Sequence, residues 1–154
     1  MHPTDILSQE HRVIEARLDA LELELQALES GQPLRREWFA ETLDFFRDFA
    51  DHRHHAKEEA LLFPRMKARG VPEQGGPIGV MLAEHDQGRS YLQTVRHNLA
   101  DGGSRDAVIA AARGYIALLR QHIYKEDHIL FEMARRVLRA EDVEALNREF
   151  AAAG

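Results

Sequence analysis

Hydrophobic residues recur along this chain at the three- and four-residue spacing of helices that bury one face. The first such stripe covers residues 4–30, and the Gly31-Gln32-Pro33 segment interrupts it. Comparable stripes predict further helices over about residues 34–69, 78–100 and 104–138, with a short one over about 141–150. No strand pattern is visible. Four long helices with short connections favour an all-α fold, an antiparallel up-down four-helix bundle followed by a short C-terminal helix.

The turn residues agree with these helix limits. Thr4 or Asp5 can cap the first helix, Pro77 suits the first position of the third, and Ser104 is a good cap for the fourth. A chain of 154 residues has room for one sizeable core, in which about 68–70% of the extended surface is buried. We therefore expect a single domain over residues 1–154, with the bundle over about 4–138.

The polar residues that interrupt the second stripe repeat in the fourth. Residues 54–63 read HHAKEEALLF and residues 122–131 read HIYKEDHILF. Within one helix, residues four apart share a face, so His54 lies beside Glu58 and His122 lies beside Glu126. An imidazole next to a carboxylate is a half-site for a divalent metal such as iron, manganese or zinc. The repeat falls on residues whose side chains can bind a metal, so we do not attribute this His/Glu pattern to chance.

A shorter motif repeats upstream of each copy. Glu10-His11 lies in the first predicted helix and Glu84-His85 lies in the third. His11 stands about as far before the first turn as His54 and Glu58 stand after it. His85 likewise stands about as far before the turn near Gly102 as His122 and Glu126 stand after it. Because helix rise is constant, antiparallel packing brings these side chains to one level of the bundle. The residues predicted to meet are His11, His54, Glu58, His85, His122 and Glu126.

Composition narrows the possible functions. The net charge is −6 and no basic stripe is visible, which argues against a nucleic-acid partner. The chain contains no cysteine, so thiolate metal sites, iron–sulfur clusters and cysteine catalysis are excluded. No run of 18 apolar residues and no signal-peptide pattern is visible, so we expect a cytoplasmic protein without a membrane partner. Nine histidines remain to be explained. A ferritin-like site is rejected, because such sites use Glu-x-x-His, whereas here histidine comes first and the carboxylate follows four residues later.

At these residues the chain resembles the hemerythrin family in its bacterial form, the hemerythrin-like HHE cation-binding domain. The shared marks are the two EH pairs and the two HxxxE motifs, which span residues 11–131. The resemblance implies two iron ions in a four-helix bundle, with manganese or zinc as less favoured metals. It further implies that Glu58 and Glu126 bridge the metals, that His11 and His54 serve one iron, and that His85 and His122 serve the other.

One position departs from that family. Respiratory hemerythrins carry a further histidine one turn before the position of His85, and this chain has Met81 there. A thioether is a poor ligand for ferric iron, so the iron attached to His85 is expected to be one histidine short. Tyr115 and Glu84 are the side chains considered for filling the gap. On the fourth helix, Asp127 remains an alternative to Glu126.

The remaining polar residues are expected to play minor parts. His55 is expected to support a ligand or face the surface, Glu59 and Asp127 to hydrogen-bond ligand histidines or face solvent, and Glu10 and Glu84 to be helix-surface acids. Of the other histidines, His52 and His97 are expected to be solvated and His2 to belong to a disordered terminus.

The resemblance implies a non-haem di-iron protein that binds or senses dioxygen, peroxide or nitric oxide. Two alternatives remain open: a di-iron enzyme that consumes peroxide or does redox chemistry, and an iron storage or delivery protein. The expected partners of such a di-iron protein are a small diatomic ligand or peroxide, and the chain is expected to be a monomer or homodimer.

Overall fold

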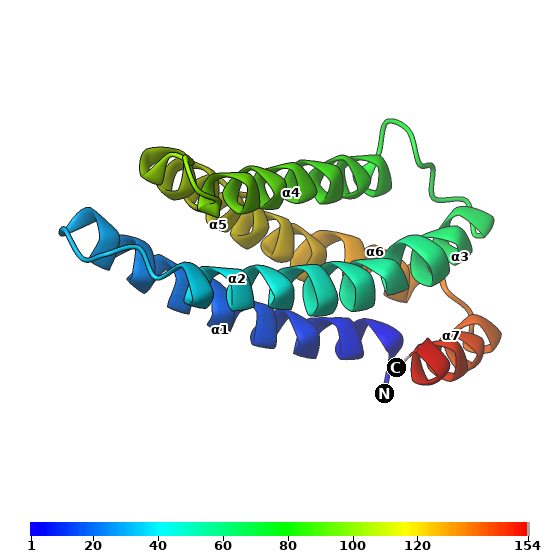
Figure 1. Ribbon diagram of the computed structural model, residues 1–154. Coiled ribbons are helices and arrows are strands. Elements are labelled where there is room, and N and C mark those ends of the chain that lie inside the picture. The colour runs from blue at the N-terminus through cyan, green and yellow to red at the C-terminus, as the bar shows by residue number, and fades with distance from the viewer. Residues whose placement is uncertain (154) are drawn as a thin grey trace.

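The computed structural model describes residues 1–153, and these residues form helices and connecting turns without a β-strand. Long helices run antiparallel to form a bundle, which confirms the predicted all-α fold (Figure 1). The elements in chain order are α1 (Pro3–Glu29), α2 (Arg36–Phe45), η1 (Phe46–His55), η2 (Glu58–Leu62), α3 (Phe63–Ala68), α4 (Pro77–Leu99), α5 (Arg105–Lys125), η3 (Glu126–Leu130), α6 (Phe131–Val137) and α7 (Ala140–Ala153).

Several of these elements join end to end. The run from α2 to α3 occupies the predicted second helix, and the run from α5 to α6 occupies the predicted fourth. The segments η1, η2 and η3 are π-helical, which the sequence pattern did not predict. A π-helix bonds i to i+5 and so has a wider turn than an α-helix. All three segments carry or adjoin the HxxxE residues, so the helix is widened where the ligand-type side chains lie.

The helix ends follow the predicted turn chemistry with one correction. Ser104 caps α5 by accepting a hydrogen bond from the Ala107 amide at 3.1 Å. The cap of α1 is His2, whose Nδ1 accepts from the Thr4 amide at 3.2 Å, while the Asp5 carboxylate accepts from the His2 amide at 3.1 Å. The predictions of a Thr4 or Asp5 cap and of a disordered His2 were therefore wrong. Gly31 follows the C-cap of α1 and has a φ of 98°, a conformation that favours glycine.

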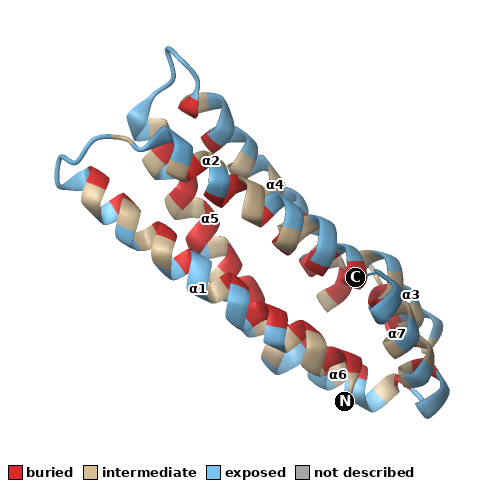
Figure 2. Ribbon diagram, turned by 60° about the horizontal axis from the view of Figure 1, so that its bottom comes forward, coloured by how far each residue is buried: buried red, intermediate tan, exposed pale blue. Residues whose placement is uncertain are grey.

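Two apolar clusters fill the bundle, and the buried stripes of the helices face each other across it (Figure 2). One cluster contains Leu18, Phe46 and Leu119, and the other contains Leu7, Phe63 and Phe131. In each of the four antiparallel runs of the bundle, the predicted ligand residues lie near the boundary between the two clusters. The polar side chains are therefore held inside the bundle with packed apolar layers on both sides.

The C-terminal helix α7 docks on one side of this bundle, beside α3 and the start of α1 (Figure 1). Leu146 and Phe150 are buried in the second apolar cluster. Asp142 is held by Arg69 at 2.7 Å and by the Arg139 amide at 2.9 Å. No helix among residues 1–153 has the length and hydropathy needed to cross a membrane.

Candidate metal centre

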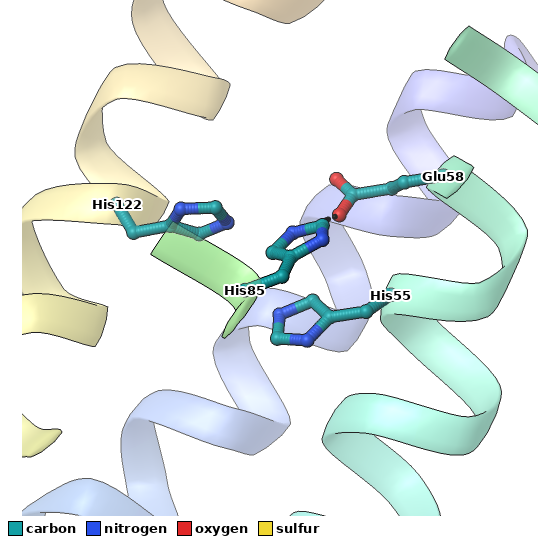
Figure 3. Close-up of side chains that lie close together, drawn as sticks. All are labelled: His55, Glu58, His85 and His122. Atoms are coloured by element: carbon teal, nitrogen blue, oxygen red, sulfur yellow. Dashed lines mark ion pairs between the residues drawn. The ribbon is translucent and has the colours of Figure 1, made fainter. Parts of the chain in front are cut away.

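The six side chains predicted to meet lie together in the middle of the bundle, and all of them are buried. They come from α1, from the boundary between η1 and η2, from α4, and from the junction of α5 with η3. Ligand atoms gather in two groups, and within each group every atom lies within 4.8 Å of the others. The first group contains His11, His54, Glu58 and Glu126; the second contains His55, Glu58, His85 and His122 (Figure 3).

Two carboxylates occupy the space between the groups. Glu58 Oε1 lies 3.2 Å from His85 Nε2, and its other oxygen lies 3.9 Å from His54 Nε2. Glu126 Oε1 lies 3.0 Å from His11 Nε2 and 3.4 Å from His122 Nε2. Each carboxylate thus stands between one histidine of each group, the arrangement that a carboxylate bridging two metals requires.

The cluster has more ligand atoms than its own hydrogen bonds satisfy. Among the described residues, the buried side-chain atoms without a partner include His54 Nε2, His85 Nε2, His122 Nε2, both Glu58 oxygens and Glu126 Oε2, and otherwise only Asn147 Oδ1. An unpaired buried polar atom costs about 1–3 kcal/mol, so such a concentration needs a reason. Imidazole and carboxylate donors suit iron, manganese and zinc, and the donor set therefore fits a pair of such cations.

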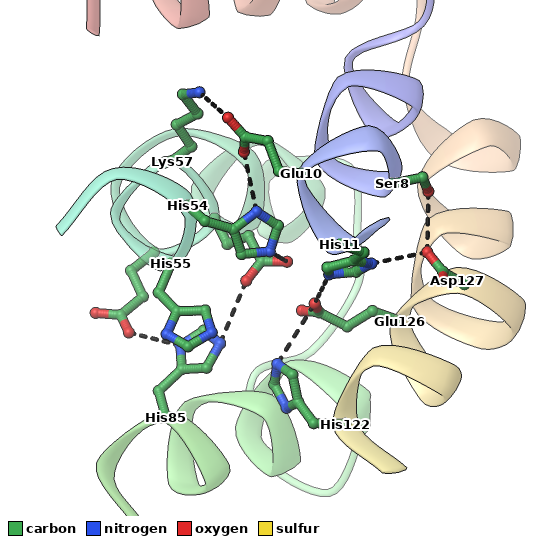
Figure 4. A network of polar contacts seen from close by, with 12 residues as sticks. Ser8, Glu10, His11, His54, His55, Lys57, His85, His122, Glu126 and Asp127 are labelled. Carbon is green, nitrogen blue, oxygen red and sulfur yellow. Dashed lines mark hydrogen bonds and ion pairs between the residues drawn. The ribbon is translucent and has the colours of Figure 1, made fainter. Parts of the chain in front are cut away.

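Outer carboxylates hold the histidines in this orientation. Glu10 accepts from His54 Nδ1 at 2.9 Å and from Lys57 Nζ at 2.6 Å (Figure 4). Glu84 accepts from His122 Nδ1 at 2.9 Å and from Lys125 Nζ at 2.5 Å. The expectation that Glu10 and Glu84 are surface acids was wrong, because each reaches across to the helix of the HxxxE motif.

The two remaining predicted ligand histidines have the same kind of support. His11 Nδ1 lies 2.8 Å from Asp127 Oδ1, and Asp127 also accepts from Ser8 at 2.9 Å and pairs with Arg12. His85 Nδ1 lies 2.6 Å from Glu59 Oε2. Asp127 thus orients a histidine from outside, and Glu126 is the acid that enters the cluster. Carboxylates on Nδ1 fix the tautomer and aim Nε2 inward, the support that metal-binding histidines typically receive.

His55 does not face the surface. It is buried, and its ring stacks on that of His85 with centroids 3.9 Å apart. Sequence reasoning used the i, i+4 spacing of His54 and Glu58 and overlooked that His55 stands three residues before Glu58, which is also a same-face spacing. Met81 is buried in the second apolar cluster. Neither residue considered for its gap fills it, since Glu84 holds His122 and Tyr115 packs on Phe46 at 5.0 Å.

Burial and close charges shift the protonation of the cluster. Burial lowers the pKa of His54 to about 4, against the opposing effect of Glu10. Burial and then the charge of Glu126 raise the pKa of Glu58 well above its usual range. Burial alone would lower the pKa of His122, but the Glu126 carboxylate raises it to about 9. Glu58 and Glu126 are both buried and their charges repel, which disfavours ionisation of both carboxylates unless a cation compensates them.

Two phenylalanine rings, one from each repeated unit, cover one side of the cluster. Phe131 stacks on His11 at 5.5 Å and 11°, and Phe63 stacks on His85 at 6.3 Å and 14°. The two phenylalanines are equivalent in the sequence repeat. Each unit therefore supplies the apolar cover over a histidine of the other unit.

Comparison with known proteins places the chain among metal-binding domains of similar sequence. The family model of the hemerythrin HHE cation binding domain matches residues 2–134. The iron-sulfur cluster repair protein YtfE of Musicola paradisiaca is 37% identical over 90 residues, which cover 54% of this chain and 40% of that protein. Its namesake in Dickeya chrysanthemi is 32% identical over 90 residues, covering 54% and 41%. The YtfE protein of Escherichia coli O157:H7 is 32% identical over 88 residues, covering 53% and 40%. The aligned part is thus less than half the length of these relatives.

Proposed function

Because the chain belongs to the hemerythrin HHE cation-binding domain family, we propose that it is a non-haem di-iron protein that binds or senses dioxygen, peroxide or nitric oxide. The observation that carries this proposal is the pair of four-residue ligand groups that share Glu58. A shared carboxylate favours two cations held side by side over two independent sites. Iron is the preferred metal because the family resemblance points to it and because the donors are imidazoles and carboxylates.

The six predicted residues hold the centre in this proposal. His11 and His54 serve one iron, His85 and His122 serve the other, and Glu58 and Glu126 stand between them. Two bound ferrous ions would supply the electrons and the coordination positions by which a small oxidant or nitric oxide is captured.

The protein matrix contributes orientation and exclusion of water. The Nδ1–carboxylate contacts prevent the imidazole rings from turning, which keeps every Nε2 directed at the centre. Phe63 and Phe131 keep one side of the cluster apolar, so a small neutral molecule enters more readily than a hydrated ion. An apolar cover of this kind favours diatomic ligands and peroxide as partners over larger substrates.

The test is elemental analysis of protein produced with ample iron, together with its absorption spectrum before and after exposure to air, peroxide and nitric oxide. Two irons per chain and a change of spectrum with at least one of these ligands are expected. One metal per chain, or none, would reject the di-iron assignment. Two irons with a spectrum that none of the three molecules alters would reject the ligand-binding function but keep the metal centre.

A second candidate function is iron supply, which the relatives favour, since they are named as iron-sulfur cluster repair proteins. The two functions make opposite demands on the centre. Supply requires iron to leave when the protein meets an acceptor, whereas ligand binding requires it to stay. Loading the protein with iron and measuring transfer to a cluster-depleted acceptor protein separates them.

An enzyme that consumes peroxide is the remaining alternative. It would remove many equivalents of peroxide per chain when a reductant is present, whereas a sensor would react about once. Counting peroxide consumed per iron pair distinguishes the two. We further propose that the chain acts as a monomer or homodimer, which light scattering checks directly.

A further inference from the structure

The two halves of the cluster differ at the second position of the repeat. Aligning His54 with His122 places His55 opposite Ile123. Ile123 belongs to the first apolar cluster, while His55 lies among the ligand-type side chains. The repeat therefore carries a fifth buried imidazole in one half that the other half lacks, and the family motif of two EH pairs and two HxxxE motifs does not account for it.

His55 is placed as the other cluster histidines are. Its ring stacks on His85 at an interplanar angle of 18° and meets the ring of His122 edge-on at 5.6 Å (Figure 3). Its ligand atom lies within 4.8 Å of those of Glu58, His85 and His122. The wider π-helical turn that ends at His55 is where two consecutive histidines both enter the interior.

The outer face of His55 also has a carboxylate. His55 Nδ1 lies 3.3 Å from Asp51 Oδ1, and Arg89 Nε binds Asp51 at 3.0 Å. Arg89 also donates to Glu59 at 2.8 Å, and Glu59 holds His85 Nδ1. One guanidinium thus positions both carboxylates, and through them two stacked histidines. All five buried histidines of the cluster share the pattern of Nδ1 on a carboxylate, which leaves Nε2 as the inward atom.

We propose that His55 is a third imidazole ligand of the metal held by His85 and His122. This inference rests on the proposed di-iron function. It assigns to His55 the position that Met81 leaves open, so that this metal is not one histidine short. The centre then has five histidines divided three to two, and the metal held by His11 and His54 has the smaller share. Asp51 and Arg89 are positioning residues for the third ligand.

The experiment compares the iron-loaded parent protein with His55→Ala, His55→Gln and the control His52→Ala, in which an exposed histidine of the same segment is removed. Iron release to a strong chelator and the visible spectrum are recorded, without and with added imidazole. We expect one of the two irons of His55→Ala to leave about tenfold faster or more, and added imidazole to restore both the rate and the spectrum. His52→Ala should match the parent.

The outcomes separate the two proposals. Fewer than two irons in the parent overturns the di-iron function, and this inference with it. Two irons in the parent, with unchanged release and spectrum in both His55 variants, overturns only the ligand role of His55. If iron release is faster and imidazole does not reverse it, and the melting temperature of the metal-free variant also falls, then His55 has a packing role. That result also overturns its role as a ligand. His55→Gln, which keeps most of the volume, checks the fold if His55→Ala is unstable.

Discussion

The two units of the bundle carry the same chain of contacts but differ in their exposure to solvent. In the first unit His54 binds Glu10 and Glu10 binds Lys57; in the second His122 binds Glu84 and Glu84 binds Lys125. The Lys57 side chain is 4% exposed, whereas that of Lys125 is 35% exposed. Helix α7 accounts for the difference, since Phe150 lies beneath Lys57 with its ring centre 5.7 Å from Nζ.

The comparison shows that the two copies of the motif share the same geometry but are expected to contribute differently to stability. The same hydrogen bond costs more to break when both partners are removed from water, because the remaining charge then has no solvent to stabilise it. Residues 140–153 also lie beyond the part of the chain that matches the family model. The difference between the units is thus imposed from outside the shared bundle.

The largest expected effect comes from the carboxylate that both ligand groups share. Glu58→Gln should reduce iron content from two per chain to one or none, because it removes a charged donor from both groups. The metal-free protein should be as stable as the parent or more so, by up to about 2 kcal/mol, since an amide replaces a buried carboxylate whose oxygens have no partner. Elemental analysis and denaturant unfolding test the two halves of this prediction. A large loss of metal-free stability would show that Glu58 is mainly structural.

The covered and uncovered ion pairs should respond differently to the same substitution. Lys57→Met should lower the free energy of unfolding of the metal-free protein by about 2–4 kcal/mol, because Glu10 is left buried with one partner fewer. Lys125→Met should cost about 0–1 kcal/mol, since its pair with Glu84 is partly solvated. Urea unfolding of both variants provides the comparison. Equal losses of unfolding free energy would mean that α7 does not shield the Glu10–Lys57 pair from solvent.

The docking of α7 should depend on pH through Asp142. The Arg69 hydrogen bond lowers the pKa of this carboxyl from 3.8 to about 2. A folded-state pKa below the unfolded value adds stability above pH 3.8, and this stability is lost as the pH falls towards 2. Asp142→Asn should therefore lower stability by about 1–2 kcal/mol at pH 7 and flatten the acid limb of the stability profile. Glu141→Gln, at an exposed neighbour that also binds Arg69, should leave that limb unchanged.

The smallest effect is expected at the exposed histidines. His52→Ala and His97→Ala should leave iron content unchanged and shift stability by no more than about 0.5 kcal/mol, because both side chains face solvent. His54→Ala and His122→Ala, prepared in parallel, should lose iron. If all four variants retained the same iron content, the inward face of the bundle would not be the metal face.

Much of the fold followed from the sequence. The apolar stripes, with Gly31 and Ser104 at the turns, predicted the long helices to within a few residues. The repeat predicted that six ligand-type residues meet at one level, and the structure brings them together. These features depend on helical periodicity and rise, which are local properties that every helix obeys. Ligation by these residues itself stays a prediction until metal is measured.

The supporting residues required the tertiary structure. The sequence treated Glu10 and Glu84 as surface acids and left Asp127 as an alternative to Glu126, because periodicity assigns residues to a face of their own helix and says nothing about the rotation of the neighbouring helices. Contacts such as His11 to Asp127 join residues more than a hundred positions apart. The burial of His55 beside His85 was not predicted, for a related reason. A π-helical segment changes the phase of the helix, and only the packing of four helices around a shared cluster decided which consecutive residues turned inward.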